Sequence, residues 1–359
     1  MSKQNESTLK TGALVAGAAV LAAAQTSRAA LSEEAFLNKV QSEDATERRD
    51  AWMQAGEQNP AVIAKLGPLV VHTHLGVAQA AEYSLTNLVN AVGKDPEDPR
   101  RGEVVQQLMQ LFRSNSQDVQ VLSLRLLSHV ASENEAEEIA RFINVPGLCE
   151  EAVYCLERIP GEKATQALVD SMDQAPSHFQ QRILTALGFR DDSVGLEALG
   201  RAMESPDVDT ALTAMKSIAR IGKRPPVGRP PQLKEGDVTA RQFREYCDCY
   251  LRICDAYIAS ESYERPLEIL GKMQSDIVPN HEHIHSAVLV CLSGIPRAEA
   301  ARMAIEQMET HPSYIVKDTA KKALISMKGS QVDSVIDQAI SNANGDVKEM
   351  LESVQKARA

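Results

Sequence analysis

The chain has 359 residues and a formal net charge of −11 at neutral pH, from 49 acidic and 38 basic side chains. Nucleic-acid-binding proteins usually carry a basic surface, and anionic membranes repel acidic proteins, so the charge argues against both classes. Hydrophobic residues make up 43% of the chain and aromatic residues only 4%. The core is therefore expected to consist mainly of alanine, leucine, isoleucine and methionine.

The first 30 residues differ from the rest of the chain. Lys3 and Lys10 precede an uncharged apolar run at residues 13–24, and small residues suited to a cleavage site follow it. This layout is typical of a secretory signal peptide, and the run is too short to span a bilayer. We therefore expect an exported protein, periplasmic or extracellular. The alternative is a cytoplasmic protein with an alanine-rich N-terminal helix.

Residues 31–114 predict irregular helical repeats that cap the N-terminal end of an array. The segment 31–73 predicts two or three helices and contains Trp52, the only tryptophan of the chain. Two longer helices are predicted at 75–92 and 103–112. The loop between them is polar and contains proline.

A regular repeat follows at residues 115–222. Leu156 and Leu168 recur thirty-one positions later as Leu187 and Leu199, and self-similarity at such a period is the signature of a helical solenoid. Within each unit, a leucine is followed twelve and sixteen positions later by two further apolar residues. Five units obey this spacing: Leu127 with Ile139 and Ile143, Leu156 with Leu168 and Met172, Leu187 with Leu199 and Met203, Leu292 with Ala304 and Met308, and Leu324 with Ile336 and Ile340.

The spacing predicts a helix, a tight turn and a second helix in each unit. Apolar residues three or four apart line one face of a helix, and polar or helix-breaking residues separate the two halves. A hairpin of this kind must stack on a neighbour to cover its apolar face. We therefore predict an all-α fold, an α-solenoid (superhelix) of stacked antiparallel helical hairpins. The pattern resumes over 239–359 and ends in a short closing helix.

Residues 223–238 interrupt the repeats with a proline-rich, basic insertion. Lys223, Arg224, Arg229 and Lys234 are its basic residues, and its first twelve residues contain no acidic one. Four prolines exclude a helix and favour an extended segment. The insertion is interpreted as a surface loop, or as a basic finger that contacts an acidic partner.

The six cysteines do not form a metal or haem motif, since no CxxC or CxxCH occurs. Cys155 and Cys291 take the same position in their repeats, just before the repeat leucine, so buried thiols are expected. Cys247 and Cys254 would lie two helical turns apart, about 10 Å, which is too far for a disulfide.

The sequence Ala186-Leu187-Gly188, with Asp191-Asp192 and Leu196 after it, resembles a HEAT repeat. It is similar to the short HEAT units also seen in phycobilisome-lyase-like repeats, with a helix, a glycine, an acidic turn and a second helix. The resemblance covers about residues 115–345 and, less regularly, 42–114. It implies a right-handed superhelix whose inner helices present a concave partner-binding surface. HEAT repeats serve many functions, so it does not imply one activity.

Two groups of residues are candidate sites. His281, His283 and His285 are weak candidates for a metal site, since His281 and His285 would share a helix face. The preceding Pro279-Asn280 predicts that a loop meets a helix there, which breaks the geometry, so no metal and no cofactor are predicted. The second group is a row of charged residues of both signs on the second helices: Arg141, Asp170, Glu197, Arg201, Arg302 and Glu306.

The charged row has two interpretations. It is either a solvated face with ion pairs between repeats, which are worth little each, or a concave recognition strip for a protein partner. Mixed signs suit a protein surface better than a nucleic-acid backbone.

No catalytic motif such as GxSxG, HExxH, a P-loop or GxGxxG occurs in the sequence. We therefore predict a non-enzymatic HEAT-repeat scaffold that mediates protein–protein interaction. Its partner would be an unidentified protein, with no nucleic acid bound and no membrane span in the mature chain. The alternative is a repeat-built enzyme, either lyase-like or metal-dependent through the three histidines.

Overall fold

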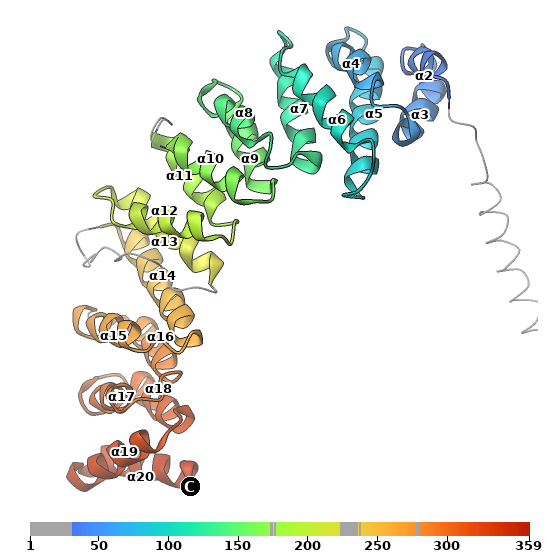
Figure 1. Ribbon diagram of the computed structural model, residues 1–359. Helices are drawn as coiled ribbons and strands as arrows, with labels where there is room; N and C mark the ends of the chain where they lie inside the picture. The colour runs from blue at the N-terminus through green and yellow to red at the C-terminus, as the bar shows by residue number, and fades with distance from the viewer. Residues whose placement is uncertain (1–30, 173–174, 176, 223–235, 237, 278–279) are drawn as a thin grey trace, which may run out of the picture. The chain divides into compact units, whose positions relative to one another are not determined.

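The computed structural model describes residues 31–172, 175, 177–222, 236, 238–277 and 280–359 (Figure 1). The predicted signal peptide and the basic residues Lys223, Arg224, Arg229 and Lys234 lie outside these ranges. None of the helices in the described part has the length and apolar character that a membrane span requires. The chain divides into two compact units, with the boundary between Ala131 and Ser132.

The N-terminal unit consists of two layers of helices. One layer contains α3, α5 and α7, and the other contains α2, α4 and α6. Two short 3-10 helices, η1 and η2, pack against α5. The bounds are α2 (Glu33–Val40), α3 (Ala45–Met53), η1 (Ala55–Glu57), α4 (Val62–Leu66), η2 (Gly67–Val71), α5 (Leu75–Gly93), α6 (Arg101–Leu111) and α7 (Gln117–Val130).

The C-terminal unit repeats the two-layer arrangement over more helices. Its first layer contains α9, α11, α13, α14, α16, α18 and α20, and its second contains α8, α10, α12, α15, α17 and α19. The bounds are α8 (Ala136–Ala140), η3 (Arg141–Asn144), α9 (Cys149–Arg158), α10 (Glu162–Met172), α11 (Ser177–Leu187), α12 (Ser193–Met203), α13 (Val208–Ile221), α14 (Ala240–Ala259), α15 (Glu264–Asp276), α16 (Glu282–Leu292), α17 (Ala298–Thr310), α18 (Tyr314–Ser326), α19 (Ser330–Asn342) and α20 (Gly345–Arg358).

The second layer of this unit is interrupted once. α13 is followed in the first layer by α14, which packs directly against it, and no described helix of the second layer comes between α12 and α15. The predicted insertion falls between α13 and α14, and only residues 236 and 238 of it are described. The sequence predicts that regular repeats begin at residue 115. The boundary between the compact units does not test this, because it describes contacts rather than repeat regularity, so the domain division stays a prediction.

The repeat leucines form the core, as the spacing predicts. Leu127, Leu156, Leu187, Leu292 and Leu324 all have no exposed surface. Most of the apolar residues twelve and sixteen positions later are also buried, on the second helix of the same unit. This confirms the all-α solenoid of stacked antiparallel hairpins.

Capping side chains set where several helices begin. The carboxylate of Asp192 accepts a hydrogen bond of 2.8 Å from the backbone N–H of Gly195 at the start of α12. At the start of α13, Asp207 accepts hydrogen bonds from the side-chain hydroxyl of Thr210 at 2.5 Å and from its backbone N–H at 2.9 Å. These two hydrogen bonds lower the pKa of Asp207. α14 begins with a capping box at Thr239. Each cap satisfies N–H groups that have no partner inside the helix.

The glycine of the HEAT-like unit allows two first-layer helices to approach closely. A Cβ atom added at Gly188 would lie 2.8 Å from the backbone Cα of Ser217 in α13. Backbone cannot move aside as a flexible side chain can, so the contact requires glycine. The glycine in the motif therefore has a packing role between α11 and α13.

Arg190 joins one repeat to the next through the end of a helix. It is only 8% exposed, and its guanidinium donates hydrogen bonds of 2.7, 2.6 and 2.6 Å to the carbonyl oxygens of Leu156, Ile159 and Gly161. Carbonyls at the end of a helix such as α9 have no partner inside it. Burial lowers the pKa of Arg190, and the nearby Asp192 carboxylate, 3.6 Å away, opposes that effect.

Arg358 repeats this arrangement at the C-terminal end of the unit. Its guanidinium donates to the carbonyl oxygen of Leu324 at 2.5 Å and to that of Met327, and it pairs with Asp333 at 2.7 Å. Leu324 and Met327 take the same two repeat positions as the residues that Arg190 caps. In both cases the arginine comes thirty-four positions after the repeat leucine. Two repeats thus use the same inter-repeat cap.

Replacing Arg190 should destabilise the C-terminal unit. Arg190→Met leaves several buried carbonyls without a donor, and we expect a loss of about 3 kcal/mol in the free energy of unfolding. Arg190→Lys should also destabilise the unit, because an ammonium cannot reproduce the planar set of donors. Urea unfolding followed by circular dichroism measures both. Wild-type stability in Arg190→Met would contradict the capping role.

One substitution in the core and one on the surface test which helix faces are buried and which are exposed. Leu187→Ala should cost about 2–5 kcal/mol, because it leaves a cavity at a fully buried position. Arg201→Ala should change stability by less than about 0.5 kcal/mol, since Arg201 is exposed on α12. The same unfolding experiment compares the two variants, and similar losses in both would contradict the assigned faces.

All six cysteines are buried and free. Burial raises the pKa of the Cys149 thiol to about 11 and that of Cys249 to about 12. Thiols with raised pKa values carry little thiolate at neutral pH and react slowly. The prediction of buried thiols at Cys155 and Cys291 is confirmed, and so is the prediction that Cys247 and Cys254 form no disulfide.

Candidate functional site

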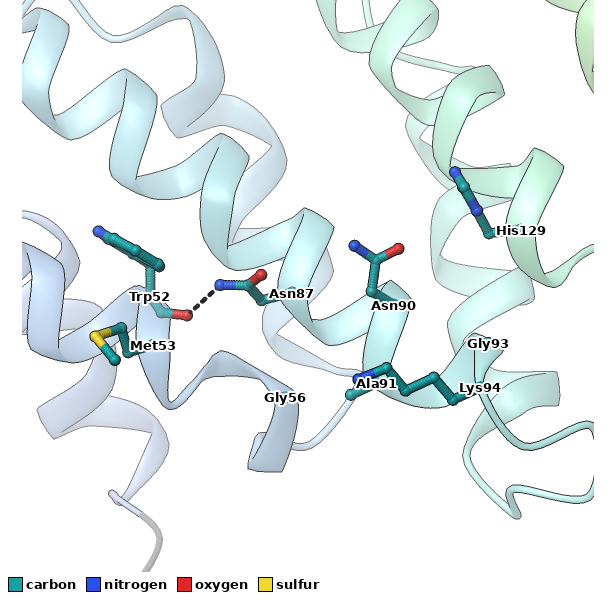
Figure 2. Close-up of a pocket in the computed structure, with 9 residues that line it drawn as sticks. All are labelled: Trp52, Met53, Gly56, Asn87, Asn90, Ala91, Gly93, Lys94 and His129. Carbon is teal, nitrogen blue, oxygen red and sulfur yellow. Dashed lines mark hydrogen bonds between the residues drawn. The ribbon is translucent and has the colours of Figure 1, made fainter.

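The N-terminal unit has an open groove of about 640 Å³ on the layer formed by α3, α5 and α7 (Figure 2). Its lining comes from the end of α3, from η1, from the second half of α5 and from α7. The lining residues are Trp52, Met53, Gly56, Asn87, Asn90, Ala91, Gly93, Lys94 and His129. All of them belong to the same compact unit.

Two glycines hold the elements of the groove close together. A Cβ atom added at Gly56 in η1 would lie 3.0 Å from the Cβ of Ala91 on α5. One added at Gly93, the last residue of α5, would lie 3.2 Å from the backbone oxygen of His129 on α7. Both distances are shorter than ordinary carbon contacts. Glycine at these positions therefore lets η1 and α7 approach α5 from either side.

One side of the groove is an exposed apolar surface. The rings of Trp52 and Tyr83 lie 5.4 Å apart at a tilted angle of 52°, which suits an aromatic pair. Tyr83 is 51% exposed and Met53 is 60% exposed. The amide of Asn87 donates a hydrogen bond of 2.8 Å to the backbone carbonyl of Trp52, which attaches this surface to α5 (Figure 2).

The middle of the groove carries amide side chains from α5. Asn87 and Asn90 are three positions apart, so they share one face of the helix. The amide nitrogen of Asn87 donates its hydrogen bond to the carbonyl of Trp52. The exposed amide of Asn90 makes no hydrogen bond to any other described residue. An amide side chain has both donors and acceptors and so matches the hydrogen-bonding groups of a peptide backbone.

The other side of the groove carries basic side chains and no acidic ones. Lys94 and His129 line it, and none of the nine lining residues is Asp or Glu. In the view of Figure 2, the side chain of Lys94 extends back along α5 in the direction of Ala91. Within the described part of the chain, the Lys94 ammonium makes no hydrogen bond or ion pair. It is therefore available to an anionic group of a ligand.

The structure divides the predicted histidine cluster. α16 begins after His281, whose ring lies 5.9 Å from that of His283 and 6.2 Å from that of Phe243. His285 is buried, and its ring instead lies 4.8 Å from that of His311. Among the residues that the structure describes, no three His, Cys, Asp or Glu side chains are grouped for a metal ion.

The predicted charged row lies on the second layer of the C-terminal unit, where all six side chains are exposed. These are Arg141, Asp170, Glu197, Arg201, Arg302 and Glu306. The contacts that the structure gives them are within their own helical segment rather than between repeats. Arg141 lies 3.5 Å from Glu137, Gln166 donates to Asp170 at 2.7 Å, and Arg302 lies 4.0 Å from Glu299.

The interruption of the second layer also divides this row. Arg141, Asp170, Glu197 and Arg201 precede it, whereas Arg302 and Glu306 follow it on α17. The row is therefore not one uninterrupted strip along consecutive hairpins in the described residues. Its role as a recognition strip stays a prediction.

The groove does not follow from the repeat pattern. Trp52 is distinguished in the sequence only as the single tryptophan, and Lys94 lies in the segment predicted as a loop between the helices at 75–92 and 103–112. One signal was available, because Asn87, Asn90 and Lys94 follow one another at three and four positions and so continue one helix face. The second signal, the packing of Trp52 against α5, depends on residues thirty-five positions apart and is visible only in the folded unit.

No protein-family model matches the chain, and no curated protein matches it. An engineered protein solved by the Northeast Structural Genomics Consortium aligns with 91% of this chain and 98% of its own, at 15% identity and a TM-score of 0.38. A chain from the structure of Kap95p with RanGDP aligns with 90% of this chain and 50% of its own, at 10% identity and a TM-score of 0.49.

A chain from the Kap95:Nup1 complex aligns with 91% of this chain and 51% of its own, at 10% identity and a TM-score of 0.47. The present chain therefore spans about half the length of the matched chains in both Kap95 structures. Structural similarity with TM-scores below 0.5 gives no information about the function of the groove. The fold assignment depends on the packing of the chain's own hairpins.

Asn87 and the single tryptophan provide a direct test of the groove. Asn87→Ala removes the hydrogen bond to the Trp52 carbonyl, so we expect a loss of about 1 kcal/mol in stability. The tryptophan emission should shift to longer wavelength as Trp52 becomes more exposed. Asn90→Ala should leave the emission unchanged, because Asn90 does not contact Trp52 through a hydrogen bond. Identical spectra for all three proteins would contradict this arrangement.

Proposed function

We propose that this HEAT-like repeat protein is a scaffold for protein–protein interaction, and that its N-terminal groove binds an extended polypeptide segment of a partner. The observation that carries the proposal is an apolar surface formed by the exposed side chains of Tyr83 and Met53 and the half-buried Trp52. Beside it lies the exposed amide of Asn90, which makes no hydrogen bond to another described residue. Tryptophan and tyrosine dominate the binding energy of many interfaces. The amide supplies polar contacts that a peptide backbone needs.

Other ligand classes fit the groove less well. A nucleic acid would need several cations along its backbone, and only Lys94 and His129 line the groove. A small apolar ligand is usually held in a concave site that covers most of its surface, whereas this groove is open. An extended peptide can lie along an open groove and bury part of each exposed side chain. The class of ligand that suits all parts of the groove is therefore a polypeptide.

The structure gives no support to the metal-dependent enzyme alternative. That alternative depended on His281, His283 and His285 acting together, and His285 is buried against His311 instead. The lyase-like form of the enzyme alternative stays a prediction. The proposal of a scaffold rests on the groove itself.

Two matched tyrosine substitutions test the proposed function. Tyr83 beside the groove and Tyr314 on α18 are exposed by 51% and 74%. The wild-type protein would be used to isolate its partner from the cells that produce it, and the recovery with each variant would be quantified. Tyr83→Ala should reduce recovery by tenfold or more, in keeping with the loss of an interface tyrosine, about 1.4 kcal/mol or above.

Tyr314→Ala should leave recovery unchanged, because it removes a similar side chain from the other unit. Both tyrosines are largely exposed, so neither substitution should unfold the protein. Equal recovery with Tyr83→Ala and wild type would overturn the groove as the binding site. Loss with Tyr314→Ala alone would place the interface in the C-terminal unit.

We also propose that the protein is exported, on the basis of the apolar run at residues 13–24. Mass spectrometry of the N-terminus of the native protein tests this. A chain that begins shortly after this run, isolated from the periplasm or medium, would support export. A chain that begins at Met1 or Ser2, isolated from the cytoplasm, would overturn it.

A further inference from the structure

We infer that the segment bound in the groove is acidic, with an apolar side chain on Trp52 and Met53 and an Asp or Glu carboxylate at Lys94. This inference rests on the proposed function and names the chemistry of the partner.

The charge of the groove differs from that of the chain. The chain carries a net charge of −11, yet the nine lining residues include a lysine and a histidine and no carboxylate. The ammonium of Lys94 has no anionic partner among the described residues. A hydrogen bond between an ammonium and a carboxylate is about twice as strong as one between neutral groups. An acidic side chain would therefore gain a contact here that the folded chain leaves unused.

Apolar, amide and basic side chains follow one another from one side of the groove to the other. Figure 2 shows Trp52 and Met53 on one side, Asn87 and Asn90 in the middle, and Lys94 on the other side with its side chain extending in the direction of Ala91. A ligand that uses all of them presents an apolar side chain, then backbone, then a carboxylate.

The helical rise sets the spacing between the two ligand side chains. Asn87 holds the carbonyl of Trp52, and the Lys94 side chain extends back in the direction of Ala91, which is four positions after Asn87 on α5. Four residues of an α-helix rise about 6 Å, and an extended strand covers that length in about two residues. The acidic residue should therefore follow or precede the apolar residue by about two or three positions.

The carboxylate is best supplied by a side chain rather than by a chain terminus or a phosphate. Terminal carboxylates are commonly bound by several backbone N–H groups. Here α5 ends at Gly93 and α7 at Val130, and helix C-termini present carbonyl oxygens and a partial negative charge. That field disfavours a dianionic phosphate more strongly than a singly charged carboxylate. The two helix ends also offer no free N–H groups to a chain terminus. A single side-chain carboxylate needs only the one ammonium that is present.

Selection from a displayed library of random twelve-residue peptides tests the inference on the full chain. Wild type should enrich peptides in which Asp or Glu lies two or three positions from an aromatic or aliphatic residue. Lys94→Glu should lose these peptides and enrich Lys or Arg at the same position. Lys328→Glu, with the same change of net charge on an exposed residue of the other unit, should select as wild type does.

One enriched peptide, made synthetically, gives the magnitude through the emission of Trp52. Replacing its acidic residue by the amide should weaken binding to wild type about tenfold, as expected for loss of one charge-assisted contact of about 1.4 kcal/mol. The same replacement should change binding to Lys94→Gln by less than about twofold. Added salt should weaken only the wild-type complex with the acidic peptide.

The possible outcomes separate this inference from the proposed function. If neutral or basic peptides are enriched and their binding requires Tyr83, the acidic preference is overturned and the groove remains a peptide site. If no enriched peptide depends on Tyr83, both the inference and the groove assignment are wrong.

Discussion

The structure depends on the inability of a single helical hairpin to cover its own apolar face. Each repeat leucine, such as Leu156 or Leu324, is fully buried because the next hairpin stacks on it. Stacking leaves the last carbonyls of a helix beside the following repeat, and Arg190 and Arg358 donate to them there. Burial of apolar side chains thus determines how the hairpins stack. Stacking also buries carbonyl oxygens at the ends of helices, and the two arginines supply their hydrogen-bond donors.

Stacking uses one face of each helix and leaves another face free for other contacts. On α5 the inward positions include Leu85, Leu88 and Val92, all fully buried. The opposite face carries Asn87 and Asn90. Asn87 holds the carbonyl of Trp52, whereas the fold does not require the exposed amide of Asn90, which is therefore available for recognition. The exposed ring of Tyr83 on the same helix needs an explanation that packing does not supply.

The repeat pattern was sufficient for the fold but did not point to the groove. Regular units drew attention to the C-terminal unit, where the exposed charges of α12 and α17 are separated by the interruption between α13 and α14. The less regular N-terminal helices were treated as a cap. Their irregularity includes η1, which brings Gly56 next to Ala91 and so helps to form the groove. A departure from the repeat was the informative feature.

Local periodicity was enough to place helices, turns and buried leucines, because apolar spacing of three or four residues reports one face of a helix wherever that helix lies. The same spacing of three and four positions relates Asn87, Asn90 and Lys94, although Lys94 lies just past the end of α5 in the segment predicted as a loop. The groove itself joins Trp52 and His129 to that face from different helices. Their proximity is a consequence of stacking between hairpins, which depends on the close approach allowed at Gly56 and Gly93 and has no counterpart in the spacing along any one helix.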